Sequence, residues 1–211
     1  MNPQKPIILY GFPKSGHSHR AELMLRLVEL NFEFREVDLR GGEQKGEAFL
    51  KLNAFGLVPV IDDDGVVIAD SNAILVYLAK KYDPSGAWLP QDAVGAAQVQ
   101  RWLSVAQGPL FNGPCSARLV TVFAAPFDHE RAKTIAASLF LTLDAHLAGK
   151  DFLLGKRATV ADVALYSYTA HAPEGGVSLA PYGNIRAWLR RIEAMPHFSP
   201  MPATRAGLLA A

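Results

Sequence analysis

The chain has 211 residues, half of them hydrophobic, and it carries 21 basic against 20 acidic side chains. This length allows one domain or two modest ones around a sizeable core, and the near-neutral charge gives no indication of a nucleic-acid or membrane-surface partner. Cys115 is the single cysteine and cannot form an internal disulfide, and no apolar run reaches the roughly 20 residues of a membrane span. Since no signal peptide is evident either, we expect a cytoplasmic protein.

The first part of the chain alternates between strand and helix patterns. The apolar spacing predicts, in chain order, a strand at residues 7–10, a helix at 17–30, a strand at 34–39, a helix at 43–52, a hairpin near residue 62 and a helix at 71–82. We expect the hydroxyl of Ser71 to cap the last of these helices. The order β-α-β-α-β-β-α fits a thioredoxin-like domain with one mixed sheet.

The second part of the chain contains helix patterns only. Two prolines and a glycine within residues 83–90 predict a linker between a domain at residues 1–82 and an all-α domain at 91–211. Helical spacing occurs at residues 91–122, 128–147, 160–171 and 184–195, and Gly108-Pro109 and Gly113-Pro114 should interrupt the first of these helices. Thr159 and Asp162 have the spacing of a capping box, so we expect Asp162 to be structural.

Proline at position 59 is informative because proline cannot donate to a sheet ladder, so Pro59 should open its strand at a turn or edge. Val58-Pro59, the hairpin that follows and the helix opening at Asp70-Ser71 together resemble the glutathione-binding half of the cytosolic glutathione transferases. The resemblance implies a cis Val58-Pro59 bond that presents backbone to the bound peptide.

The turn after the first strand lacks the Cys-x-x-Cys of thioredoxins and reads Lys14-Ser15-Gly16-His17-Ser18. The chain therefore has no dithiol of its own but can act on a thiol bound at that helix N-terminus. A free thiol titrates near ~8.5, and lowering its pKa by about two units requires ~2.7 kcal/mol. A charge-assisted hydrogen bond contributes roughly 1.5–3 kcal/mol and a helix N-terminus about 0.3–1, so one hydroxyl is enough.

Three hydroxyl groups are candidates for that role, namely those of Ser15, Ser18 and Tyr10. The run from Ser15 to Arg20 resembles the Ser-type motif of bacterial zeta-like and theta-like glutathione transferases, which implies that Ser15 faces the sulfur. Ser18 is the alternative, or else a helix cap, and Tyr10 fits a core position better. His17 and His19 lack partners at metal-ligand spacing, so we expect loop or helix-surface histidines and no metal.

The resemblance also implies the remaining contacts of glutathione, the expected co-substrate. Asp70 would pair with the γ-glutamyl amine, Ser71 and its amides would hold the α-carboxylate, Val58 next to Pro59 would bond the cysteinyl backbone, and Gln44 and Lys45 would receive the glycine carboxylate. The electrophile site would lie between the first loop and the first long helix of the α domain. Its main candidates are Phe12, Trp102, Phe111, Arg118 and Tyr166, whose apolar bias points to a hydrophobic co-substrate.

The resemblance therefore implies a homodimeric glutathione transferase in which Ser15 stabilises the thiolate that attacks a hydrophobic electrophile. Two alternatives remain open from the sequence. One is another glutathione-dependent enzyme, either an isomerase or a disulfide reductase. The other is a non-catalytic binding protein that kept the fold, although Ser15, Asp70 and Ser71 favour an active site over this last alternative.

Overall fold

The N-terminal part of the computed structural model, which describes residues 3–206, is built on a four-stranded sheet. The strands are β1 (Ile7–Gly11), β2 (Phe32–Glu36), β3 (Val60–Asp63) and β4 (Val66–Ala69), arranged in the order β2-β1-β3-β4. β1 runs parallel to β2 and antiparallel to β3. The predicted mixed sheet is therefore confirmed, although β2 begins two residues earlier than expected.

The predicted hairpin joins β3 to β4 through Asp64 and Gly65. Both residues have positive φ angles, of 52° and 90°, which suits the two-residue turn that matches the twist of paired strands. The carboxylate of Asp62 accepts the Gly65 amide at 2.7 Å and closes the turn. The hairpin fixes a register in which Val60 faces Ala69, immediately before Asp70.

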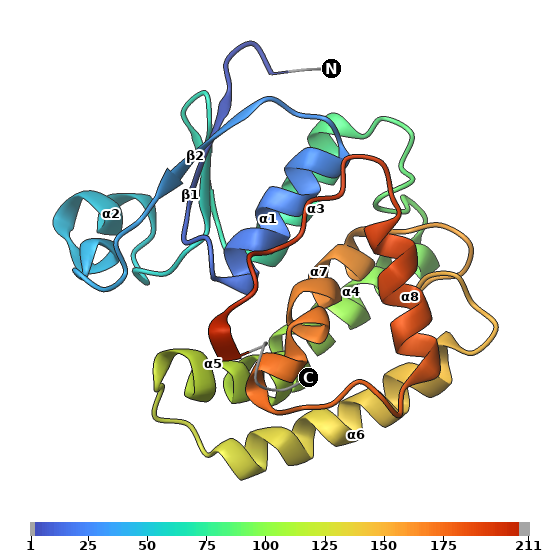
Figure 1. Ribbon diagram of the computed structural model, residues 1–211. Coiled ribbons are helices and arrows are strands. Elements are labelled where there is room, and N and C mark those ends of the chain that lie inside the picture. Colours follow the sequence, from blue (N-terminus) through green and yellow to red (C-terminus); the bar gives the residue numbers. More distant parts are fainter. Residues whose placement is uncertain (1–2, 207–211) are drawn as a thin grey trace.

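Helices cover both faces of the sheet (Figure 1). α1 (Gly16–Leu27) and α3 (Ser71–Tyr82) pack side by side on the face that meets the second half of the chain. On the other face, η1 (Glu43–Lys45) and α2 (Glu47–Leu52) cover a small cluster of Val37, Phe49 and Val60. The single helix predicted at 43–52 is wrong in detail, because Gly46 is extended, with ψ of 154°, and separates the two segments.

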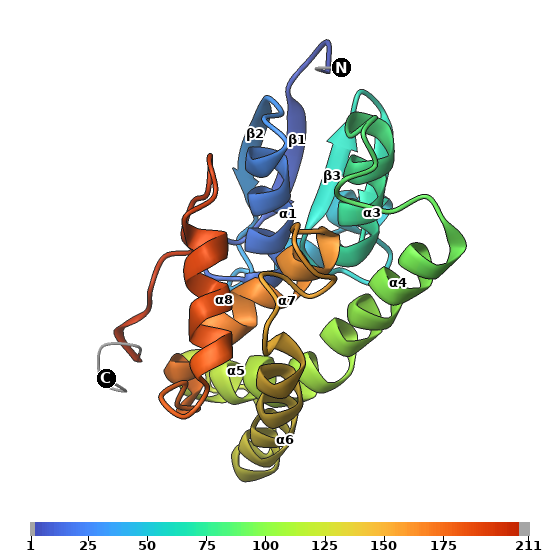
Figure 2. The ribbon, with the colours of Figure 1, turned by 90° about the vertical axis from the view of Figure 1, so that its right-hand side faces the viewer.

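The second half is helical, as predicted, and α7 lies at its centre (Figure 2). Its segments are α4 (Ala93–Gln107), the π-helix η2 (Phe111–Cys115), α5 (Ser116–Phe123), α6 (His129–Leu147), α7 (Val160–Ala170), η3 (Ala172–Gly175) and α8 (Gly183–Glu193). α7 is buried on all sides from Val160 to Thr169, as befits a central helix. The expected interruption of the first long helix is confirmed, since it breaks at Gly108 and continues through a π-helix that contains Pro114.

One buried apolar cluster runs from the sheet through α1, α3 and α7 to α4, α6 and α8. The two halves are in close contact at Gly16, where a Cβ atom would lie 2.7 Å from the Tyr168 ring. Any larger residue here would require the ring or the helix to move. The division of the chain at residues 83–90 stays a prediction.

The predicted capping box opens α7 and is confirmed. Thr159 accepts the Ala161 amide, and Asp162 Oδ2 accepts the Thr159 amide at 2.9 Å. Asp162 Oδ1 also accepts the Leu153 amide and the Trp188 indole N–H, each at 2.9 Å. The carboxylate therefore has a structural role, because its oxygens are fully engaged in holding the start of the buried helix.

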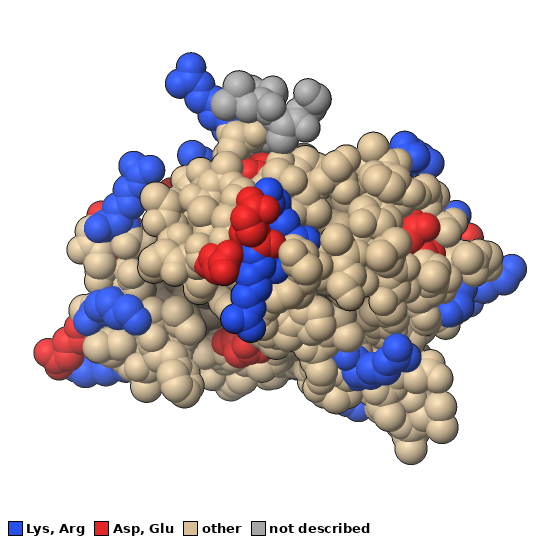
Figure 3. All heavy atoms as spheres, turned by 90° about the horizontal axis from the view of Figure 1, so that it is seen from below, with Lys and Arg blue, Asp and Glu red and all other residues tan. Residues whose placement is uncertain are grey.

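Charged side chains are dispersed over one face of the molecule (Figure 3). On the face seen from below, basic and acidic side chains are interspersed among uncharged residues (Figure 3). Within residues 3–206, none of the helices combines the length and apolarity needed to cross a bilayer.

His19 is buried between the halves, so the expectation of a surface histidine is wrong. Its Nε2 lies 2.8 Å from the carbonyl of Ser199, which makes Nε2 the donor, and Nδ1 then accepts from the Ser167 hydroxyl at 2.9 Å. Burial lowers the pKa of His19 to about 4. The neutral ring thus ties α1 to α7 and to the C-terminal segment.

We expect the protein to lose stability as the pH falls from neutrality. His19 is protonated near pH 6.5 when unfolded but only near about 4 when folded, so its contribution is complete above 6.5 and is lost toward 4. Between pH 7 and 5 this costs about 2 kcal/mol of unfolding free energy. Urea titrations at several pH values should show a shallower pH dependence for His19→Gln than for the wild type, and equal slopes would contradict the assignment.

Candidate active site

Ser15 is the N-cap of α1. Its Oγ accepts the Ser18 amide at 3.3 Å, and its carbonyl accepts the first intrahelical bond from His19. Because Oγ accepts from the helix, its own proton is available to a group outside. The unpaired amides and dipole of the helix start favour an anion at the same place. The half-buried Ser15 hydroxyl is thus suited to donate to a thiolate.

Ser18, the alternative candidate, points into the protein. It is fully buried, and its Oγ accepts the Phe12 amide at 3.0 Å, which holds the loop after β1 against the helix. Tyr10 packs against Phe49 in the smaller apolar cluster, as expected of a core residue. None of the three candidate hydroxyls, that of Ser15 included, is among the residues that line the two pockets described next.

The first pocket has a volume of about 510 Å³ and gathers four of the predicted glutathione residues. Val58, Pro59, Asp70 and Ser71 line it, and the Val58-Pro59 bond is cis, as predicted. Phe111, which the sequence indicated for the electrophile site, also lines this pocket. The wall is completed by residues for which the sequence indicated no binding role: His17, Asn53, Phe55, Leu57, Ala69 and Gln107.

The roles of Asp70 and Ser71 at the start of α3 differ from the prediction. Asp70, not Ser71, caps α3, because its Oδ1 accepts the Asn72 and Ala73 amides at 2.9 and 3.0 Å. Its other oxygen accepts from the Gln107 side chain at 3.0 Å, which brings α4 to the pocket. Asp70 holds this position with a φ of 74°, an uncommon conformation for a non-glycine residue.

His17 and Arg20 support Ser71 from beneath. Arg20 donates from Nη1 to the Ser71 hydroxyl at 2.9 Å, and His17 Nδ1 lies 3.1 Å from the same oxygen. Burial, assisted by the charge of Arg20, lowers the pKa of His17 to about 3, so the ring is neutral. His17 is therefore not the surface histidine expected, and among the described residues no cluster of metal-ligating side chains occurs. An arginine on the apolar face of an amphipathic helix was the only sequence signal for this support.

Gln44 and Lys45, the predicted carboxylate contacts, lie beside the first pocket rather than in its wall. Lys45 Nζ donates to the Phe55 carbonyl at 3.0 Å and lies against Gly56, where a Cβ would be 2.9 Å from it. Gln44 donates to the Leu39 carbonyl at 3.4 Å. The Lys45 ammonium thus lies next to the wall segment that Phe55 and Leu57 form.

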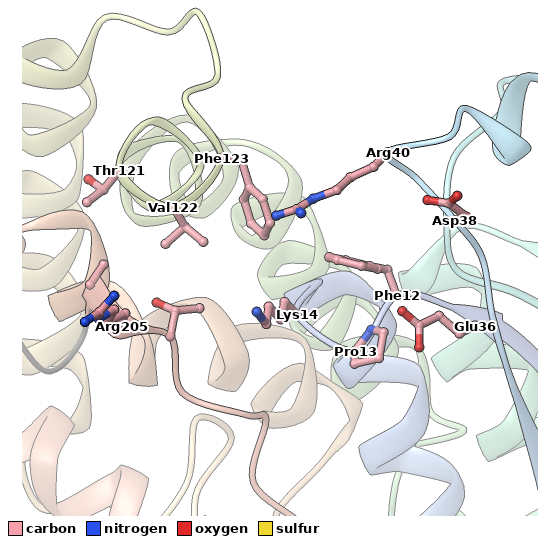
Figure 4. A pocket seen from close by; sticks show the side chains of 12 residues that line it. Phe12, Pro13, Lys14, Glu36, Asp38, Arg40, Thr121, Val122, Phe123 and Arg205 are labelled. Carbon is pink, nitrogen blue, oxygen red and sulfur yellow. The ribbon is translucent and has the colours of Figure 1, made fainter.

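The second pocket, of about 540 Å³, is lined in part by the loop after β1 (Figure 4). Four segments form its walls: residues 12–14, residues 36, 38 and 40, residues 121–123, and residues 204–206. The rings of Phe12 and Phe123 meet edge to face at 6.2 Å and supply an aromatic surface. Lys14 lines this pocket and His17 lines the first, so Ser15 stands in the chain between the two walls.

The five residues predicted to contact the electrophile do not line one common pocket. Phe12 lines the second pocket, whereas Phe111 lines the first. Trp102, Arg118 and Tyr166 reach neither pocket, since each is at most 4% exposed. The Trp102 and His146 rings pack at a tilt with their centroids 4.7 Å apart, and the Tyr166 hydroxyl donates to Glu193 at 3.0 Å. The sequence placed these three on the correct helices but could not show that their side chains face the core.

Known proteins resemble both halves of the chain. The glutathione S-transferase N-terminal domain matches residues 15–81, and the glutathione S-transferase C-terminal domain matches residues 124–196. Glutathione S-transferase 3 of Zea mays is 32% identical over 204 residues, which cover 92% of this chain and 91% of the relative.

Solved structures agree with this match. A glutathione S-transferase from Pseudomonas fluorescens superposes with a TM-score of 0.86 at 31% identity, covering 94% of this chain and all of the other. A glutathione transferase homologue from Drosophila mojavensis, solved with bound glutathione, gives 0.84 at 26% identity and covers 97% and 94%. The predicted thioredoxin-like domain followed by a helical domain is confirmed, and the chain belongs to the cytosolic glutathione transferase superfamily.

Proposed function

We propose that this glutathione transferase uses the Ser15 hydroxyl to stabilise the thiolate of glutathione. One observation carries the proposal: Ser15 begins α1 with its Oγ occupied as an acceptor, between a pocket lined by Lys14 and one lined by His17. A hydroxyl in this position donates its proton outward, toward a group that bridges the two pockets.

The first pocket suits the tripeptide. The Ser71 amide and hydroxyl, at the start of α3, would hold the γ-glutamyl carboxylate, with Asp70 at the neighbouring amine. The backbone of Val58, adjacent to cis-Pro59, would pair with the cysteinyl backbone in extended fashion. Lys45, already beside the Phe55 carbonyl, would meet the glycine carboxylate, with Gln44 next to it. A similar protein was solved with bound glutathione, which supports glutathione as the ligand.

The second pocket would hold the electrophile, a small hydrophobic molecule packed on Phe12 and Phe123. The thiol proton leaves to solvent, and the sulfur forms a bond to the electrophilic carbon while a leaving group departs with its bonding electrons. Ser15 favours this step because it lowers the thiol pKa and so raises the fraction of nucleophilic anion at neutral pH.

Calorimetric titration of the purified protein with reduced glutathione, alongside ultraviolet difference spectra of the thiolate, tests this function. Binding with thiolate absorbance at neutral pH, followed by conjugation to chlorodinitrobenzene, is the expected result. Binding without thiolate would contradict the role of Ser15. No binding at millimolar glutathione would contradict the function itself.

We also propose a homodimer, supported by apolar side chains that protrude next to the first pocket. Phe55 is 81% exposed and Leu57 61% exposed, on the segment between α2 and β3. Adjacent exposed apolar residues of this size are typical of an interaction surface. A second copy of the chain would bury them.

Light scattering coupled to gel filtration checks the dimer. We expect a mass near twice 22.9 kDa for the wild type and a shift toward the monomer for Phe55→Ser, because the serine removes the largest apolar contact. Leu141→Ser is the matched control, since Leu141 is 66% exposed on α6, away from this segment. A Phe55→Ser protein that keeps the dimer mass would place the interface elsewhere.

Cys115 supports the cytoplasmic location that we propose. Its side chain is fully buried, and burial raises the pKa of the thiol to about 12. An inert, unpaired cysteine is compatible with a reducing compartment.

A further inference from the structure

A buried ion pair lies behind the second pocket without lining it. Arg118 on α5 donates from Nε to Oε2 of Glu174 on η3 at 2.6 Å, and the two side chains are 0% and 3% exposed. Glu174 Oε1 also lies 2.8 Å from His171 Nδ1. Both residues of the pair lie in the helical half, but the pair also contacts the N-terminal half.

Those contacts reach three of the four wall segments. Arg118 Nη1 donates to the Lys14 carbonyl at 2.9 Å, and the guanidinium lies over the Phe123 ring at 5.7 Å. Glu174 Oε1 accepts the Thr204 amide at 3.0 Å. One ion pair therefore connects the loop at 12–14, the end of α5 at 121–123 and the C-terminal segment at 204–206.

The chemistry of the pair suits positioning better than stabilisation. A planar guanidinium bonds two acceptors at fixed angles and stacks on a ring at once, which a lysine ammonium cannot reproduce. Buried ion pairs add little net stability over apolar residues of similar volume. The Lys14 carbonyl that Arg118 holds belongs to the peptide bond that enters Ser15.

We propose that Arg118 and Glu174 are positioning residues that hold the C-terminal segment and the Ser15 loop in the arrangement that forms the electrophile pocket. The inference rests on the proposed function. The pair contacts Lys14, Phe123 and Thr204, which line the second pocket and not the first. Its effect should therefore fall on the electrophile and leave glutathione binding unchanged.

Arg118→Lys tests the idea with the charge retained. The lysine can still pair with Glu174 but cannot also bond the Lys14 carbonyl and stack on Phe123. At saturating glutathione we expect kcat/KM for chlorodinitrobenzene to fall about tenfold, since small misplacements of reacting groups carry losses of this order. The dissociation constant of glutathione should stay within about twofold of the wild-type value, whereas a merely structural loss would move both.

A second variant tests directly whether the ion pair holds the C-terminal segment in place. Arg118→Met with Glu174→Leu replaces the pair by apolar side chains, keeps the fold and removes the acceptor of the Thr204 amide. Hydrogen exchange of residues 200–206 should accelerate about tenfold, because that amide loses its buried partner. Asp151→Asn, at the half-exposed ion pair with Arg191, is the matched control and should change neither exchange nor kinetics.

Wild-type kcat/KM in Arg118→Lys would overturn the proposal, as would an equal loss of glutathione affinity or unchanged exchange in the double variant. A failure of the proposed function would give a different set of results from a failure of this proposal. A wild-type protein that conjugates no electrophile would overturn the function, while the exchange measurement would still support or overturn the anchoring of the C-terminal segment.

Discussion

Replacing Ser15 with alanine should lower transferase turnover roughly 100-fold at neutral pH. The proposed donor is the hydroxyl of Ser15, the N-cap of α1, and losing it should remove ~2.7 kcal/mol of thiolate stabilisation, or about two units of thiol pKa. The pH dependence of kcat/KM and ultraviolet titration of the bound thiol both report this change. The pKa of bound glutathione should return toward its free value.

Ser18→Ala is the control for that experiment. The two serines stand one turn apart, but the Ser18 hydroxyl holds the Phe12 amide inside the protein, so its loss should cost about 1 kcal/mol of stability and leave the thiol pKa unchanged. Ser15→Ala also removes a helix cap worth about 1 kcal/mol, so unfolding free energies must accompany the kinetics. An unchanged pH–rate profile in Ser15→Ala, or a shifted one in Ser18→Ala, would remove Ser15 from the mechanism.

The second large effect should follow from Glu174→Ala, which we expect to cost about 3–5 kcal/mol of unfolding free energy. The substitution leaves the Arg118 guanidinium buried without its carboxylate, and an uncompensated buried charge is expensive. Burial raises the pKa of Glu174, but bonds from the Thr204 amide, His171 and Arg118 outweigh this and lower it to about 2, so the group is ionised at neutral pH. Such a loss is a large fraction of the total stability of a typical domain.

Urea denaturation measures this loss. The double substitution Arg118→Met with Glu174→Leu should recover most of it, because both charges leave the interior together. If Glu174→Ala were as stable as Asp151→Asn, at the exposed pair with Arg191, the buried pair would not carry the charge balance we describe.

Local chemistry explains which elements were predictable. The Asp64-Gly65 turn, the capping box of Thr159 and Asp162 and the break at Gly108 all depend on residues close together in the chain, and all were confirmed. Helix boundaries were predicted less accurately where two neighbouring residues can both act as the helix cap. Asp70 caps α3 in place of Ser71 because a carboxylate oxygen reaches two amides at once.

The candidate site, like the fold, was predictable only in part. Family resemblance placed Val58, Pro59, Asp70 and Ser71, and these four residues share one pocket. The side chains that hold Asp70 and Ser71 in place were not predictable, because they come from distant parts of the chain. His17 contacts Ser71, 54 residues away, and Gln107 donates to Asp70, 37 residues away. Periodicity identifies which helix carries a residue but not what its side chain meets on another element.

The sequence by itself determined the order of strands and helices and the turn at Pro59, because short-range sterics decide these features. Only the tertiary structure decided that Arg118 is buried against Glu174 and holds the Lys14 carbonyl. Contacts between distant segments arise when apolar surfaces pack together, and the charges that are buried with them must then find partners across the core.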